Sequence, residues 1–135
     1  MDMRIEKKIK QLEKTHAELE TIKPNSFDAY QNLVEKAASE RYIEKITEDI
    51  ISIALRIIRI KKFEEPEDDE HIFTLLSKNN IITNQLAQRL IELKGMRNII
   101  IHEYAEIDDK IVYNALQNNL EQDVQEFIKQ IKHQL

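Results

Sequence analysis

Residues 43–60 read IEKITEDIISIALRIIRI, and this stretch decides the fold of the chain. Its isoleucines recur at intervals of three and four residues, which places them on one face of an α-helix. Other apolar residues widen that face, and so broad an apolar surface is typical of a central helix with several neighbours. The face consists of Ile43, Ile46, Ile50, Ile53, Ile57 and Ile60, widened by Ile51, Ala54 and Ile58.

The sequence before this stretch also has helical spacing. An apolar stripe in the first twenty residues ends before Pro24, so a first long helix is expected there. Ser26 is placed to cap a short segment through Leu33 and Val34 that leads into the central helix. The stripe of the first helix is Ile5, Ile9, Leu12, His16 and Leu19.

Three more helices are expected after the central one. The first spans roughly Asp68 to Lys78, and the second runs from an N-cap at Thr83 to about Ile101. Asp108 can cap the last, whose apolar face is Val112, Leu116, Leu120, Val124, Phe127 and Ile131. No β-type alternation competes with these patterns. The sequence therefore predicts an all-α, antiparallel four- to five-helix bundle that forms a single domain over residues 1–135.

Composition narrows the classes of protein that fit. The chain has 135 residues, one glycine and two prolines, which favours long helices over tight turns. It has no cysteine, which excludes disulfides and thiolate metal sites. The charged first residues and the absence of a long uncharged apolar stretch lead us to expect a cytoplasmic protein without a membrane segment.

Charge is unevenly distributed along the chain. The net charge is −5, but residues Glu64 to Glu70 hold six of the 25 acidic residues and leave 19 against 20 basic ones elsewhere. A metal site in this acidic run is one interpretation. A solvated loop whose acids complement the N-terminus of the next helix is the favoured one.

The segment Arg97 to Tyr104, which reads RNIIIHEY, breaks the apolar pattern of its helix. Arg97 falls in the middle of the stripe that also holds Leu86, Leu90, Leu93 and Ile100. A buried cation is costly unless it is paired. A structural salt bridge to Glu48 is one interpretation, and a phosphate-binding arginine is the other.

A second stripe on the same helix carries Ile91, Gly95, Asn98 and His102. Gly95 is the only glycine, and within a helix it costs about 1 kcal/mol relative to alanine. It either admits a ligand close to the backbone beside Asn98 and His102 or allows a tight helix crossing. Histidine can exchange a proton near neutral pH, so this stripe is a candidate catalytic surface.

The spacing of Arg97 and His102 limits how they can cooperate. Five residues place them roughly 140° apart around an ideal helix. They can share a pocket only if the helix unwinds near Ile101 or if a second copy of the chain supplies the other residue. The second possibility predicts a homodimer with this segment at the subunit boundary.

These residues resemble the HepT-like group of the HEPN superfamily. The group's signature is R-x-x-x-x-H-x-Y with a polar residue after the arginine, and Arg97, Asn98, His102 and Tyr104 match it. Similar segments extend over most of the chain and include Phe73 to Leu76, Glu40-Arg41 and Glu106 to Asp108. Two departures lie on the central helix, where Leu55-Arg56 replaces a common Asn-His pair and Ser52 a common acid.

The resemblance implies the toxin of a toxin–antitoxin pair, a homodimer that cleaves RNA without a metal or cofactor. His102 would transfer protons, Arg97 would hold the phosphate, and Asn98 would orient His102 or donate to the phosphate, with Gly95 and Glu48 in support. The partner would be a minimal nucleotidyltransferase antitoxin that attaches AMP to Tyr104. The alternative is a non-catalytic helical subunit that presents a nucleotide or substrate to that partner.

Overall fold

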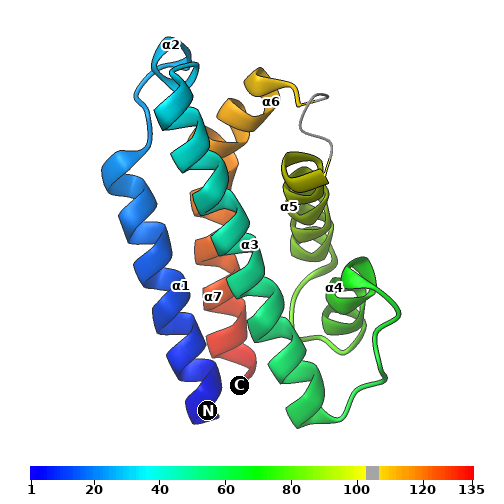
Figure 1. Ribbon diagram of the computed structural model, residues 1–135. Coiled ribbons are helices and arrows are strands. Elements are labelled where there is room, and N and C mark those ends of the chain that lie inside the picture. The colour runs from blue at the N-terminus through cyan, green and yellow to red at the C-terminus, as the bar shows by residue number, and fades with distance from the viewer. Residues whose placement is uncertain (103–106) are drawn as a thin grey trace.

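The computed structural model describes residues 1–102 and 107–135, which are helical and contain no strand (Figure 1). None of the helices in these two ranges is long and apolar enough to cross a membrane. The elements are α1 (Met3–Ile22), α2 (Phe27–Tyr30), α3 (Leu33–Lys61), α4 (Asp69–Lys78), α5 (Asn84–His102), α6 (Asp109–Asn114), a π-helical segment (Ala115–Asn119) and α7 (Leu120–Gln134). The predicted all-α bundle is confirmed.

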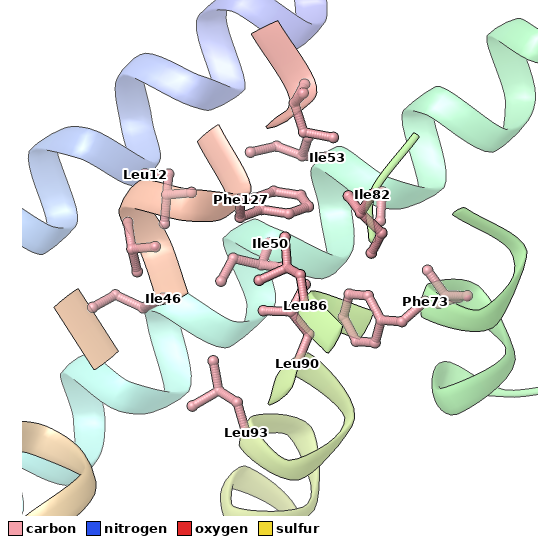
Figure 2. Packing of buried hydrophobic residues seen from close by; sticks show 14 of the residues in the cluster. Leu12, Ile46, Ile50, Ile53, Phe73, Ile82, Leu86, Leu90, Leu93 and Phe127 are labelled. Atoms are coloured by element: carbon pink, nitrogen blue, oxygen red, sulfur yellow. The ribbon is translucent and has the colours of Figure 1, made fainter. Parts of the chain in front are cut away.

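The central helix of the prediction is α3, with α1 along one side and α4 and α5 along the other (Figure 1). Its isoleucines from Ile43 to Ile58 are buried except Ile51, which is partly exposed, and Ile60 lies at the exposed edge. Phe127 of α7 packs among Leu12, Ile50 and Ile53, so that α1, α3 and α7 share one core (Figure 2). Burial of this apolar surface is the main force that holds the helices together.

Polar side chains begin the helices where the sequence predicted caps. Ser26 accepts a hydrogen bond from the backbone N–H of Ala29 (3.1 Å), and Thr83 accepts one from that of Leu86 (3.1 Å). Asp108 caps α6 in the same way. Each bond satisfies one of the backbone donors that a helix start leaves unpaired.

The acidic run forms the end of a connection and the start of α4. Asp68 accepts from the backbone N–H of His71 (2.8 Å), and Asp69 and Glu70 lie in the first turn. The expectation that these acidic side chains stabilise the N-terminus of the helix is confirmed.

The last helix differs from the prediction, which had no interruption. A π-helical turn at Ala115–Asn119 separates α6 from α7. Val112, Leu116, Leu120 and Val124 are all buried although each follows the last by four residues. Three such steps would drift by about 120° around a regular α-helix. The wider turn absorbs that drift and keeps the four residues on the core side.

Candidate functional site

Helix α5 positions the segment that the sequence singled out. It begins after the Thr83 cap and lies against α3, with α4 and α7 as its other neighbours. Its buried residues are Leu86, Ala87, Leu90, Leu93 and Ile100, several of which appear in Figure 2. These contacts fix which side of α5 faces the core and which side faces outward.

Arg97 lies on the inner side of α5, beside α4. Its Nη2 is 3.2 Å from Oδ2 of Asp69, and its side chain is only 13% exposed against 44% for Asp69. The Nε of Arg97 is buried and has no hydrogen-bond partner in the described part of the chain. The guanidinium is therefore held by one carboxylate and keeps unused donor capacity.

The carboxylate that holds Arg97 is not the one predicted. Glu48 is exposed and forms no ion pair with Arg97, so the expected bridge between these residues is wrong. Ile46 and Ile50 face the core, and Glu48, midway between them in sequence, points to the opposite side of α3. Sequence reasoning missed Asp69 because the acidic run was interpreted only as a complement to the start of α4.

His102 is the last residue of α5 and is exposed. Asn98 precedes it by four residues, is partly exposed and lies on the same side of the helix. An exposed imidazole beside an amide can exchange protons with a bound molecule. These two predicted residues therefore share one side of α5.

Gly95 lies on the outward side of α5, one turn before Asn98. Among residues 1–102 and 107–135, a Cβ built on Gly95 would meet no atom within 4 Å outside its own helix surroundings. A tight crossing with another of the described helices is therefore not the reason for this glycine. Ile99, four residues further on, is 40% exposed, so the outward side of α5 is partly apolar.

The two predicted catalytic residues do not meet within one chain. Helix α5 continues through Ile101 to His102, so the helix does not unwind to bring His102 round to the inner side. Arg97 faces α4, and His102 faces outward. A pocket that uses both residues would therefore need one of them from a second copy of the chain.

Two other predictions concern this region. Tyr104 lies outside the described residues. Among the described ranges, no group of three or more histidine and acidic side chains is placed to hold a metal ion.

A protein-family model described as ribonuclease HepT-like matches residues 5–131. The chain belongs to this family. A HepT-like relative from Shewanella oneidensis, named mRNA nuclease HepT, is 38% identical over 90 residues, which are 67% of each protein. Another from Aphanizomenon flos-aquae, named tRNA nuclease HepT, is 32% identical over 98 residues, 72% of this chain and 67% of that protein.

A solved structure extends the likeness to the whole HepT-like fold. It is described as a tri-AMPylated Shewanella oneidensis HEPN toxin in complex with MNT antitoxin. It matches with a TM-score of 0.91 and 29% identity, and covers 98% of this chain and 99% of that one. The resemblance to HEPN toxins is therefore confirmed.

Proposed function

We propose that this chain is the toxin of a toxin–antitoxin pair and acts in the cytoplasm as a homodimeric, metal-independent endoribonuclease. The observation that carries the proposal is an exposed His102 one helical turn after Asn98 on the outward side of α5, in a chain that matches the ribonuclease HepT-like family over residues 5–131. The names of its relatives as mRNA and tRNA nucleases support an RNA substrate.

The chemistry assigned to His102 is proton transfer. One imidazole takes the proton of a ribose 2′-hydroxyl, whose oxygen then attacks the adjacent phosphorus. The 5′-oxygen leaves with a proton from a second acid, which the proposal identifies as His102 of the other subunit. The products are a 2′,3′-cyclic phosphate end and a free 5′-hydroxyl, and no step requires a metal.

Arg97 supplies the positive charge that the phosphate needs as negative charge develops in the transition state. Its pairing with Asp69 keeps the guanidinium oriented while one nitrogen remains without a partner in the described ranges. Because Arg97 and His102 lie on different sides of one α5, the proposed composite site is a cleft at the subunit boundary that two copies of each residue line.

The surface proposed for dimerisation is the outward side of α5 around Gly95 and Ile99. A Cβ built on Gly95 would meet nothing of the described residues within 4 Å, and Ile99 adds exposed apolar area. Light scattering at micromolar concentration should give the mass of two chains. The mass of a single chain would contradict a site shared between two subunits.

The proposed point of control is Tyr104, two residues after His102. Its phenol oxygen would attack the α-phosphorus of ATP in the antitoxin's active site, with release of pyrophosphate and the phenolic proton. The attached anionic nucleotide would then compete with RNA for Arg97. The description of the Shewanella oneidensis structure as tri-AMPylated supports this form of control. Intact-mass spectrometry of wild type and Tyr104→Phe after incubation with the antitoxin and ATP tests it.

RNA cleavage with and without chelator is the central experiment. His102→Ala and Arg97→Ala should each lower the cleavage rate by about 10²–10³, because each removes a contact to the reacting phosphate or its proton. The matched controls are His133→Ala, another exposed histidine near a helix end, and Arg89→Ala, another ion-paired arginine of α5. Control rates that fall equally, or activity that disappears with chelator, would contradict the mechanism.

One observation favours the alternative, a subunit that binds RNA or nucleotide without cutting it. Arg97 is already occupied by Asp69 and does not face His102 in the chain. In that case, the purified wild type should bind RNA but leave its length unchanged, and His102→Ala should not alter the affinity.

A further inference from the structure

A groove on the opposite flank of α3 from α5 is lined mainly by cations. It lies between the first half of α1 and the second half of α3 and has a volume of about 430 Å³. Figure 1 shows α1 and α5 on different sides of α3, so this groove is separate from the Arg97 and His102 region. Five of its seven lining residues are basic, in a chain whose net charge is −5: Arg4, Lys7, Lys8, Arg56 and Arg59, beside Ser52 and Leu55.

A second hollow continues this groove toward the connection between α3 and α4. Its volume is about 240 Å³, and it shares Leu55 and Arg59 with the first. Lys62 adds another cation there, Glu65 adds one acid, and Phe63 adds an aromatic side chain. The two hollows form an extended basic channel, which we call the α1–α3 channel.

Few carboxylates neutralise the channel. Asp2 pairs with Arg56 at 3.3 Å, and Lys8 donates to the Ser52 hydroxyl at 2.6 Å. The Nε of Arg56 is buried, and within the described residues it has no hydrogen-bond partner. Arg4, Lys7 and Arg59 are further side chains without an ion pair in those ranges. Clustered like charges repel, so the channel favours an anionic ligand.

The form of the channel favours a polyanion over a single phosphate. Arginine forks and lysine ammonium groups both bind phosphate oxygens, and here they follow one another along two joined hollows. A basic groove that ends at an aromatic side chain is suited to single-stranded nucleic acid, because the cations contact the backbone and a base can stack on the ring.

We propose that the α1–α3 channel binds the phosphate backbone of single-stranded RNA at a distance from the cleavage site. The choice of RNA as the polyanion rests on the proposed ribonuclease function. A second contact of this kind would hold a substrate strand on the enzyme and contribute sequence-independent affinity, with a strong dependence on salt.

The test is fluorescence anisotropy of the full-length protein with a labelled 2′-O-methyl oligonucleotide, which lacks the attacking hydroxyl and is not cut. The channel variant is Lys7→Glu with Arg59→Glu, two exposed positions whose substitution spares the core. The matched control is Lys14→Glu with Arg41→Glu, which makes the same charge change at exposed positions of the same two helices outside the channel.

The channel variant should bind at least about tenfold more weakly, and its slope of log affinity against log salt should fall by about 1.4, the value for two lost phosphate contacts. The control should stay within about twofold of wild type, since its charges lie outside the contact. Equal losses in both variants would show a net-charge effect and overturn the proposal. Unchanged RNA affinity with lost antitoxin binding would overturn it too and assign the channel to an acidic protein surface.

Cleavage of unmodified RNA is measured in parallel, so the two proposals can fail separately. A wild type that binds through the channel without cutting would leave the channel intact and remove the ribonuclease assignment. A wild type that cuts RNA, together with a channel variant that binds RNA normally, would support the ribonuclease assignment and overturn the channel proposal.

Discussion

The two partners of the Arg97–Asp69 ion pair differ in burial. This difference predicts which substitution destabilises the folded state more. The guanidinium side chain is 13% exposed, whereas the carboxylate is 44% exposed. Replacement of Asp69 by asparagine leaves a largely buried cation without its counter-charge. Replacement of Arg97 by methionine leaves a carboxylate that water can reach and fills the apolar stripe between Leu93 and Ile100.

The distance between the two charges and their exposure set the free-energy cost of each substitution. At 3.2 Å, two unit charges attract by about 1.3 kcal/mol in water and about 5 kcal/mol at an effective dielectric constant of 20. The exposed carboxylate places the pair near the lower value, so Asp69→Asn should cost about 1–2 kcal/mol. Arg97→Met should lie within about 1 kcal/mol of wild type, because apolar replacement of a buried ion is often neutral or stabilising.

A double-mutant cycle measures the coupling directly. Urea unfolding is followed by circular dichroism at one fixed protein concentration, because the stability of a dimer depends on concentration. Asp69→Asn should be destabilising in wild type and close to neutral in the Arg97→Met background. A coupling energy below about 0.3 kcal/mol would refute the pair as a contributor to stability.

Three further outcomes are expected. Burial raises the pKa of Asp123, although Arg89 at 2.6 Å opposes the shift. The folded state therefore holds this proton more tightly than the unfolded state, and wild type should gain stability relative to Asp123→Asn as the pH falls through the folded pKa in urea titrations. Gly95→Ala should raise helix stability by up to about 1 kcal/mol but weaken self-association measured by analytical ultracentrifugation, since the added methyl group projects into the proposed subunit contact. Thr83→Ala should lower the unfolding free energy by about 1 kcal/mol, measured by urea unfolding, through loss of the α5 cap.

Features that depend on local spacing were predictable from the sequence. The isoleucines of α3 lie on one face wherever that helix packs, and a threonine or aspartate before an apolar run caps a helix with little help from the tertiary structure. The π-helical turn belongs partly to this group, because the repeated spacing of four from Val112 to Val124 already departs from the α-helical period.

Features that depend on packing between helices were not predictable in the same way. Asp69 reaches Arg97 only because α4 folds back against α5. The exclusion of Glu48 could have been foreseen, since its two-residue offset from Ile46 and Ile50 turns it away from the core. The open surface beside Gly95 could not have been foreseen from the sequence, because it depends on which of the described helices cover that side of α5.

The outward side of α5 combines several costs that the fold of one chain does not offset. Gly95 lowers helix stability and has no close contact among the described residues, while Ile99 exposes apolar area. His102 is exposed and lies on a different side of α5 from Arg97. A second α5 packed against this side would use the glycine as a contact surface and cover the isoleucine. Because His102 lies on the same outward side, it would also bring the two copies of His102 toward each other. This arrangement would account for the glycine, the exposed isoleucine and the exposed histidine, so dimerisation and catalysis should be lost together when this surface is disrupted.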